Sequence, residues 1–504
     1  MNTRSFWQHH APLLAMIFLI ALAVRAYRAT NEGAINPDIV RFVDQARTLL
    51  ADPLTAVRQE AYHPLHALLG GLVSRLLPTS WFSHDNFRIL AGLRIVGITC
   101  GALVAVLIFI LARQLGARTW PAAAAALLWV VGRRTSVFGA DAMSDMLFLA
   151  CFTGAAICTI NGLRQLTRHR PASIPFALSG LFAALSYLTR PEGLAISLIT
   201  VAALATLLLH QRVPLWRKFL RRRATPTAPV LRAIATHLLV LALISAPYIL
   251  TIGGLTQKKN VLPAPILQPA SLATIPAIDP YAWAKIGKEI FETFGFAPCI
   301  VLGLAMLLKP RLWGRPRLRP ISSIWFTLWL AVMLWLLASA GYLDGRHTLP
   351  LIILLHALFA LSFIPIRRLR AAAKPLAFAA FLFAIAPGLA QITDPHRADK
   401  YYLQQAAHWV DTNAGSNAIL YEHHKVVAFY AQRPATRIHT LDFPGTQREL
   451  APLLAQTPAQ PTYILCHVAD VRIAPPTLGA FRLATTFKSP LPANHDGLLI
   501  YTSP

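Results

Sequence analysis

The sequence predicts a helical domain that crosses a membrane many times, followed by a small α/β domain outside the membrane. Hydrophobic residues make up 55% and charged residues 13% of the 504 positions, with a mean hydropathy of +0.51. That composition excludes a string of soluble domains. Apolar stretches of near-spanning length recur as far as residue 392, and the composition changes after it. The two expected domains are therefore residues 1–392 and 393–504.

About 20 predominantly apolar residues are needed to cross a bilayer, and about eleven stretches approach that length. They cover residues 11–24, 89–111, 120–131, 146–163, 174–188, 193–209, 233–252, 296–308, 321–340, 348–365 and 375–392. The third and eighth stretches are short. The first is interpreted as a retained span, because no small-residue cleavage site follows it.

The distribution of charge supports this threading. If the N-terminus is cytoplasmic, five alternate connections carry basic residues and none of them contains Asp or Glu, so all 21 acidic residues lie on the other side. Cytoplasmic connections of membrane proteins are enriched in Lys and Arg, which also accounts for the net charge of +26 without nucleic acid. We interpret the run Arg221, Arg222 and Arg223 as an anchor on anionic lipid. The predicted location is the cytoplasmic (inner) membrane, with a cytoplasmic N-terminus.

Three long segments are predicted to be extracytoplasmic. Residues 25–88 are expected to form short amphipathic helices on the membrane. Residues 253–295, which carry Lys258 and Lys259 and are rich in proline, are expected to form a mobile flap. Residues 393–504 are expected to hold a helix over 400–412 and strands over 418–421, 426–430, 462–468 and 498–501.

Known nucleotide and hydrolase motifs are missing from the sequence. It has no Gly-rich phosphate loop, no GxSxG and no HExxH, and its five cysteines lie too far apart for a disulfide framework or a zinc site. Any chemistry is therefore expected from the carboxylates and cations of the extracytoplasmic connections.

The first such group surrounds Asp38. Pro37 suits the first turn of a helix, and Asp38 could stabilise that helix end or act as a general base on an acceptor hydroxyl. His63 and His66 follow in the same connection. They could share a helix face and a metal, but interfacial polar contacts are the favoured interpretation.

Three further groups lie in later connections. Asp141 and Asp145 are spaced i, i+4 and would share one face if this stretch is helical, so a cation is expected near them. Pairing with Arg133 or Arg134 is the purely structural alternative. Arg190 and Glu192 occupy a short turn, where they could pair with each other.

A second short turn, residues 341–347, carries Arg346 and His347. With Arg190, these residues could instead face an anionic headgroup.

These motifs, in this order, resemble the bacterial branch of the GT-C membrane glycosyltransferases, which includes protein mannosyltransferases and lipid A aminoarabinose transferases. They are Asp38 with Phe42 and Ala46, His-Pro-Leu at His63, Met-Ser-Asp at Asp145, Leu-Thr-Arg-Pro-Glu-Gly at Arg190, and Gly-Arg-His at Arg346. The family usually has an acidic pair in the first loop, whereas here Ile39 follows Asp38. Asp38 is therefore the match to the catalytic carboxylate. No cofactor is predicted, and a divalent cation stays an open alternative.

The resemblance implies transfer of a sugar from a polyprenyl-phosphate donor to an extracytoplasmic acceptor (a lipid, a glycan or a protein), with inversion at the anomeric carbon. Asp38 is the expected general base. The expected substrate-binding residues are His63, Asp141, Asp145, Arg190, Glu192, Arg346 and His347. Two other functional classes are compatible with a multi-pass membrane protein. One is a transporter or flippase for a lipid-linked sugar, for which His237 and His356 are the polar candidates in mid-span. The other is a structural anchor for the tail domain.

Overall fold

The computed structural model describes residues 3–212, 226–257, 280–308, 319–340, 343–362, 373–438, 443–455, 458, 460–473, 475, 477–491 and 495–504. The chain forms two compact units. The first comprises Met1–Tyr27, Thr48–Leu69 and Arg94–Thr393, and the second comprises Arg28–Arg47, Gly70–Leu93 and Asp394–Pro504. The predicted lipid anchor at Arg221–Arg223 and the predicted Lys258 and Lys259 lie outside the described residues.

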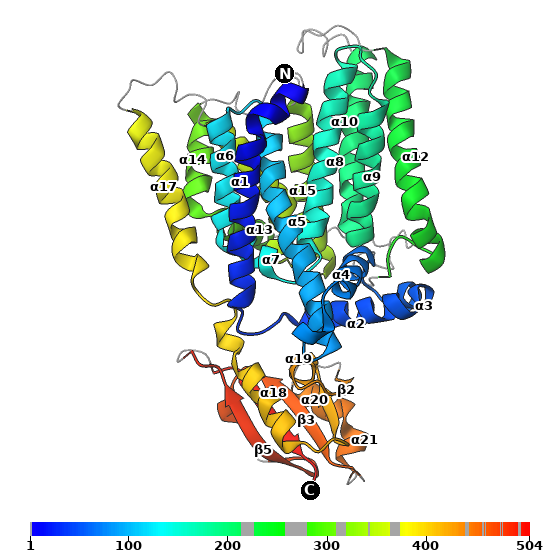
Figure 1. The fold of residues 1–504 in the computed structure, drawn as a ribbon, viewed down its shortest axis with the longest axis vertical. Helices are drawn as coiled ribbons and strands as arrows, with labels where there is room; N and C mark the ends of the chain where they lie inside the picture. The colour runs from blue at the N-terminus through cyan, green and yellow to red at the C-terminus, as the bar shows by residue number, and fades with distance from the viewer. Residues whose placement is uncertain are drawn as a thin grey trace. The chain divides into compact units, whose positions relative to one another are not determined.

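The first unit is a bundle of apolar helices (Figure 1). These helices are α1 (Thr3–Thr30), α5 (Asp85–Leu115), α6 (Thr119–Val131), α8 (Asp145–Leu166), α9 (Ser173–Thr189), α10 (Leu194–Arg212), α12 (Thr227–Ile252), α14 (Phe296–Leu308), α15 (Arg319–Ala340), α16 (Gly345–Ser362) and α17 (Ala373–Ile392). Among the described residues, six helices are long and apolar enough to cross a membrane, and four more apolar helices are shorter. The chain is thus a multi-pass membrane protein, while the number of eleven spans stays a prediction.

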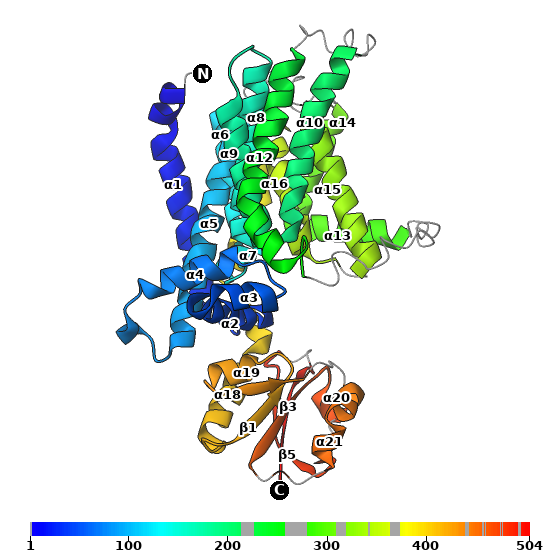
Figure 2. The ribbon, with the colours of Figure 1, turned by 90° about the vertical axis from the view of Figure 1, so that its right-hand side faces the viewer.

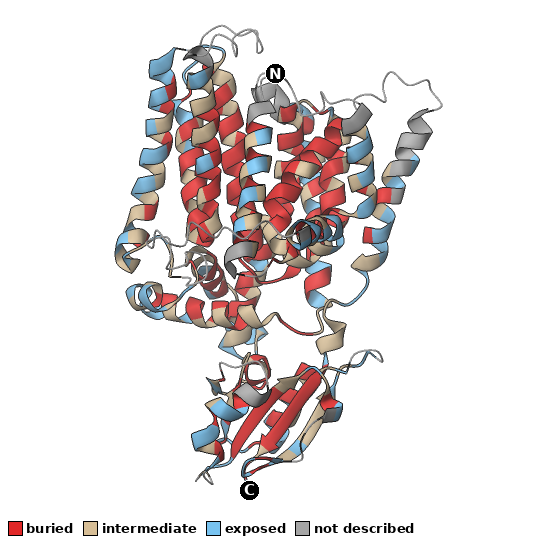
Figure 3. Cartoon of the chain, turned by 180° about the vertical axis from the view of Figure 1, so that it is seen from behind, coloured by how far each residue is buried: buried red, intermediate tan, exposed pale blue. Residues whose placement is uncertain are grey.

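Close packing between helices fixes the centre of this bundle. Helices α8, α9 and α12 run side by side (Figure 2). Gly180 on α9 lies so close to α12 that an added Cβ would come within 2.4 Å of the His237 carbonyl oxygen. The Phe152 ring on α8 packs against Trp325 and Trp329 of α15, with ring centroids 5.4 Å apart in both cases. Buried residues accordingly line the interior faces of the helices (Figure 3).

Shorter helices form in the connections between the long apolar helices. They are α2 (Pro37–Ala51), α3 (Pro53–Gln59), α4 (Leu65–Arg75), α7 (Arg133–Ala140) and α13 (Pro280–Phe294). The first three agree with the helices expected in residues 25–88.

Of the segment 253–295, where a flap is expected, the described end is the amphipathic helix α13. Ile286 and Phe294 of this helix are buried and pack against the bundle. The residues that precede α13, 258–279, lie outside the described part of the chain.

A six-stranded mixed sheet forms the core of the second unit, in the order β2-β1-β3-β6-β5-β4. The strands are β1 (Ile419–Glu422), β2 (Ala435–Arg437), β3 (Thr462–Val468), β4 (Thr477–Leu478), β5 (Phe481–Lys488) and β6 (Gly497–Thr502). Strands β2, β1 and β3 are parallel, and the remaining pairs are antiparallel. The short helix predicted over 400–412 is present as α18 (Tyr402–Asn413).

Residues 28–47 and 70–93 pack on this tail domain within the same unit. The Ile35 backbone N–H donates to the Tyr430 hydroxyl at 2.9 Å, and the Gln404 side-chain amide donates to the Gly33 carbonyl at 2.8 Å. The Phe87 ring meets the Phe429 ring edge to face, with centroids 5.6 Å apart. These contacts hold the start of α2, and with it Asp38, against the tail domain.

One predicted strand of the tail is wrong. Residues 426–430, expected as a strand for their β-branched and aromatic content, form the short helix α19 (Val426–Tyr430). The Glu422 carboxylate accepts the backbone N–H groups of Val427 and Ala428 at 3.0 and 2.9 Å. Because this carboxylate satisfies the free N–H groups of the first turn, it stabilises a helix against the strand propensity of the side chains. Strands β2, β4 and β5 had no predicted counterpart.

Candidate active site

Arg190 lies in the turn between α9 and a single-turn helix, η2 (Pro191–Gly193). A residue that precedes proline is disfavoured in the helical conformation. Arg190 is indeed extended, with φ −152° and ψ 140°. Helix α9 therefore ends at Thr189, and the Arg190 side chain starts from a defined point between α9 and α10.

Two carboxylates hold the Arg190 guanidinium. Its Nη1 donates to Asp145 Oδ1, and its Nε and Nη2 donate to the two oxygens of Glu192 at 3.4 and 3.2 Å. The exposed fractions of the Arg190, Asp145 and Glu192 side chains are 9%, 1% and 8%. The guanidinium also lies 5.6 Å from the centre of the Phe148 ring. Arg190 thus forms the ion pair with Glu192 that the sequence suggested, and it forms a second ion pair with Asp145.

The charges around Arg190 keep it protonated. Burial lowers its pKa, but the neighbouring carboxylates of Glu192 and Asp145 raise it by more, so that the net shift is upward. One guanidinium and two ionised carboxylates carry a net charge of −1, which favours a further cation nearby. Arg346 supplies positive charge that acts on Arg190.

Arg346 and His347 lie in the first turn of α16. The Nε of Arg346 is 3.5 Å from Asp344 Oδ2, and its side chain is 22% exposed. The Asp344 backbone N–H donates to His347 Nδ1 at 3.2 Å, and the Trp329 indole N–H donates to the His347 carbonyl at 2.8 Å. Because Nδ1 accepts a hydrogen bond, the neutral imidazole carries its proton on Nε2, which makes that nitrogen a donor.

The two short turns act on one another electrostatically. The charges of Arg190, Glu192, Arg346 and Asp344 all act on the His347 imidazole. The first unit therefore brings together five of the predicted substrate-binding residues, which are Asp145, Arg190, Glu192, Arg346 and His347. We call these five residues the arginine cluster.

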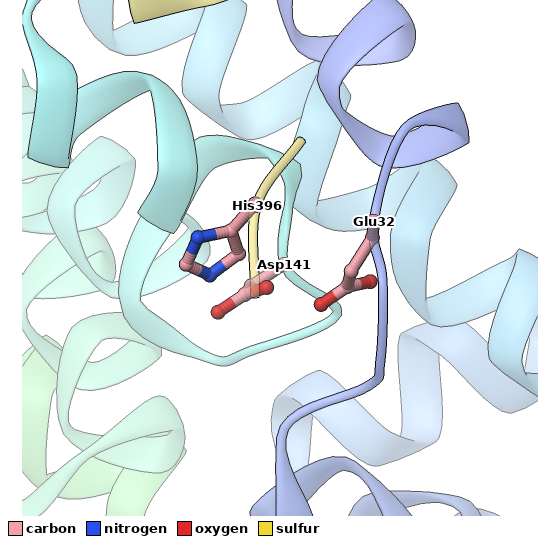
Figure 4. Close-up of side chains that lie close together, drawn as sticks. All are labelled: Glu32, Asp141 and His396. Atoms are coloured by element: carbon pink, nitrogen blue, oxygen red, sulfur yellow. The ribbon is translucent and has the colours of Figure 1, made fainter. Parts of the chain in front are cut away.

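The helical arrangement considered for Asp141 and Asp145 is not formed, and the cation beside Asp145 is Arg190. Helix α7 ends at Ala140 and α8 begins at Asp145, so Asp141, which is drawn in Figure 4, shares no helix with Asp145. Asp141 is 1% exposed and extended, and its carbonyl oxygen packs so close to α5 that a Cβ at Gly97 would come within 2.8 Å of it. Arg134, a partner in the structural alternative, instead binds Glu289 and Glu292.

His63 and His66 contact different parts of the first unit. His63 Nδ1 donates to the Tyr187 carbonyl at 2.6 Å, and its ring packs between those of Tyr187 and Tyr248 at 5.1 and 5.0 Å. His66 Nε2 donates to the Ala142 carbonyl at 3.1 Å. Burial lowers the pKa of His66 to about 4, against the raising effect of this hydrogen bond. Both histidines therefore attach the connection after α3 to the bundle through hydrogen bonds to backbone carbonyls.

Asp38 belongs to the second unit. Helix α2 begins at Pro37 and its first turn contains Asp38, whose backbone N–H donates to Asn36 Oδ1 at 3.0 Å. The Asp38 carboxylate lies 4.0 Å from Arg41 Nη1 and is 26% exposed. In the same unit, the Glu32 carboxylate accepts a hydrogen bond from Arg397 Nη1 at 2.5 Å. Glu32 also forms an isolated β-bridge with His396, and both of these residues are drawn in Figure 4.

Sequence reasoning missed the ion pairs of α13. Arg134 on α7 binds Glu289 and Glu292 of α13, two partners 155 and 158 positions away. A Cβ at Gly345 would come within 2.3 Å of Arg134 Nη1, so a larger residue at the start of α16 would displace the guanidinium. The spacing of Ile286, Ile290 and Phe294 was the available signal for an amphipathic helix, but nothing in the sequence pointed to Arg134 as its partner.

Comparisons with solved structures identify the fold. The ArnT of Cupriavidus metallidurans bound to undecaprenyl phosphate aligns over 97% of this chain and 98% of its own, with 13% identity and a TM-score of 0.59. The oligosaccharyltransferase AglB of Archaeoglobus fulgidus, in complex with an inhibitory peptide and a dolichol-phosphate, aligns over 92% of this chain and 70% of its own, with 12% identity and a TM-score of 0.57.

The chain has the fold of the GT-C membrane glycosyltransferases. No protein-family model matches the chain, and no curated protein matches it in sequence. The GT-C fold extends over the tail as well as the bundle, since the alignment with ArnT covers nearly all of both chains. The predicted resemblance, drawn from motifs as far as Arg346, is confirmed at the level of the fold.

Proposed function

We propose that this protein is an inverting glycosyltransferase that moves a sugar from a polyprenyl-phosphate donor to an extracytoplasmic acceptor. The observation that carries the proposal is the GT-C fold shared over 97% of the chain with an ArnT bound to undecaprenyl phosphate. In this proposal the chain crosses the cytoplasmic membrane eleven times, with the N-terminus inside and the tail domain outside. The acceptor is a lipid, a glycan or a protein.

The proposed transfer reaction requires few catalytic groups. A phosphate leaving group is a weak base and needs cations to stabilise its charge, whereas the acceptor hydroxyl needs one base to take its proton. In the proposed reaction, Asp38 takes that proton while the acceptor oxygen attacks the anomeric carbon. The bond between that carbon and the phosphate oxygen breaks, and the polyprenyl phosphate leaves with the electron pair.

The residues of the arginine cluster have different proposed roles in binding the donor. Arg190 already bonds two buried carboxylates, so we assign it to positioning: it holds Asp145 and Glu192 beside the turn that carries Arg346. Arg346, whose side chain is more exposed and pairs with Asp344, is the proposed ligand of the donor phosphate. The Nε2–H of His347 is the second proposed donor to that phosphate.

The test is consumption of the donor by the purified full-length protein. A panel of polyprenyl phosphates carrying different radiolabelled sugars is incubated with the protein in detergent and with lipid, glycan and peptide acceptors. Release of free polyprenyl phosphate together with a labelled product supports the proposal. Failure to consume any donor, by protein that is folded by circular dichroism, overturns it.

The flippase alternative receives no support from the two mid-span histidines. His356 Nδ1 donates to the carbonyl of Ile352 in its own helix at 2.8 Å, and its ring packs on Trp129 and Phe294. His237 Nε2 lies 3.1 Å from Ser197 Oγ. Both residues are therefore engaged in packing inside the bundle.

A further inference from the structure

Side chains of basic residue types, three histidines and one arginine, gather at one edge of the tail sheet. Strands β2, β1 and β3 are parallel and adjacent, so their carboxyl ends meet at the same edge. Arg437 ends β2, His423 and His424 directly follow β1, and His467 lies near the end of β3. In sheets with parallel strands, ligands bind beyond the carboxyl ends of the strands. We call these four residues the basic edge.

The side chains of the basic edge contact one another. The His423 and His424 rings lie 4.2 Å apart, and the His424 and His467 rings lie 5.3 Å apart. Arg437 pairs in register with Glu422 at the end of β1, and its charge acts on both His423 and His424. Four basic side chains from three strands are thus held within a small area by the sheet itself.

Among the described residues, Glu422 is a carboxylate that lies beside the basic edge. Glu422 is fully buried and accepts two backbone N–H groups of α19, at 3.0 and 2.9 Å. His467 Nε2 approaches Glu422 Oε1 only to 3.5 Å. Among the described residues, His423 Nδ1 is buried and has no hydrogen-bond partner. The edge therefore presents an imidazole nitrogen without a partner among the described residues, close enough to Arg437 for the guanidinium charge to act on that ring.

The basic edge is linked to the proposed base through α2. Arg41, one turn after Asp38 on α2, forms an ion pair with Asp38 at 4.0 Å. The same Arg41 acts electrostatically on His423 and His424. Asp38, Arg41 and the basic edge all belong to the second unit. An anion on the basic edge would accordingly lie on the side of Arg41 and the first turn of α2.

We propose that the basic edge is a binding site for a phosphate group of the acceptor, and that it places the acceptor hydroxyl for Asp38. The role in transfer rests on the proposed glycosyltransferase function, whereas the phosphate site itself does not. Phosphate fits better than a metal ion, because Arg437 and Arg41 would repel a cation at this edge. It also fits better than a carboxylate, because a dianion with several acceptor oxygens can receive hydrogen bonds from imidazole and guanidinium groups on three strands.

The electrostatics of His424 support this choice. Its pKa is lowered to about 3, first by burial and then by the positive charges of His467, His423, Arg41 and Arg437. The negative charge of a bound dianion would oppose the effect of these positive charges and raise the pKa of His424. A protonated imidazole would in turn bind the dianion more strongly.

The test measures phosphate binding by the full-length protein in detergent, by calorimetric titration at matched ionic strength. The probes are inorganic phosphate, the water-soluble glucose 1-phosphate, and acetate as the carboxylate comparison. A further arm uses lipid nanodiscs with and without phosphatidic acid, which separates a lipid phosphate from a soluble one. The variants are Arg437→Gln and His424→Gln. Their matched controls are Arg482→Gln on β5 and His408→Gln on α18, which remove the same types of side chain from exposed positions of the same domain.

Hydrogen bonds to a charged group are each worth roughly a factor of 10 to 100 in affinity. We therefore expect phosphate to bind the wild type more tightly than acetate, and Arg437→Gln and His424→Gln each to weaken that binding by about 10- to 100-fold. The two control variants should bind phosphate as the wild type does. If Arg437→Gln fails to fold, His424→Gln decides the question. Equal phosphate binding by His424→Gln and the wild type, or no preference of the wild type for phosphate over acetate, overturns the site.

The outcome for transfer is measured separately. If donor is consumed, a phosphate-bearing acceptor should show a KM raised by about 10- to 100-fold in these variants with little change in kcat, whereas a merely structural role would lower both parameters for every acceptor. Phosphate binding without any donor consumption would keep the site and reject the glycosyltransferase. Donor consumption without phosphate binding would do the reverse.

Discussion

Replacing Arg190 by leucine should destabilise the protein strongly, because it leaves two carboxylates buried without their cation. Asp145 is 1% and Glu192 8% exposed, so neither can recover water without local unfolding. Breaking a buried pair by removing one partner costs about 3–5 kcal/mol, whereas an exposed pair is worth ~1 kcal/mol or less. Arg47 provides the matched control: it pairs with Asp44 at 3.1 Å, and both side chains are 48% exposed.

The assay is the free energy of unfolding from denaturant titration in detergent micelles, followed by circular dichroism. Arg190→Leu should lose about 3–5 kcal/mol, and Arg47→Leu ~1 kcal/mol or less. The double variant Arg190→Leu, Asp145→Leu replaces a charged pair by apolar groups, so it should recover a good part of the loss. Losses that simply add in the double variant, or equal losses for Arg190→Leu and Arg47→Leu, would refute the buried ion pair.

Three further predictions concern the donor, pH and topology. Arg346→Lys keeps the charge but not the planar fork, so transfer should slow by roughly tenfold or more while the melting temperature stays within a few degrees; unchanged donor affinity and rate would remove Arg346 from the phosphate site. Because burial places the pKa of His66 near 4, against 6.5 in the unfolded chain, its neutral burial stabilises fully above pH 6.5 and less as pH falls toward 4. Between pH 6.5 and 5 the wild type should lose ~2 kcal/mol more than His66→Gln, and parallel pH profiles would contradict this. Single cysteines at Thr55 and Ser416, in a cysteine-free background, should react with an impermeant maleimide in intact spheroplasts. Protection of either cysteine until the membrane is broken argues against an extracytoplasmic location for residues 25–88 and the tail.

The sequence was most informative where one physical property dominates. Long apolar runs predict helices because the bilayer interior leaves the backbone no other partners. The short turn at Arg190 was predicted because it lies between two apolar runs, and α9 indeed ends at Thr189. Pro37 likewise predicted the start of α2, and the structure begins the helix at that residue.

Where a prediction from the sequence failed, contacts between residues distant in the sequence, or a break in a helix, determined the structure instead. The i, i+4 spacing of Asp141 and Asp145 presumed a continuous helix, but α7 ends at Ala140. Residues 426–430 have strand propensity, but they form a helix whose Val427 and Ala428 N–H groups are accepted by Glu422 in the preceding strand. The basic edge depends on the strand order β2-β1-β3, which no local pattern in the sequence reveals.

Transfer by the Asp38→Asn variant tests the central proposal most directly. The substitution keeps the shape of Asp38 and removes its proton affinity, and Asp44→Asn on the same helix is the matched control, since Asp44 is exposed and paired with Arg47. With a donor that the wild type consumes, Asp38→Asn should transfer sugar about 10²- to 10⁴-fold more slowly and still bind the donor, while Asp44→Asn should behave as the wild type. Near-normal transfer by folded Asp38→Asn would contradict the account.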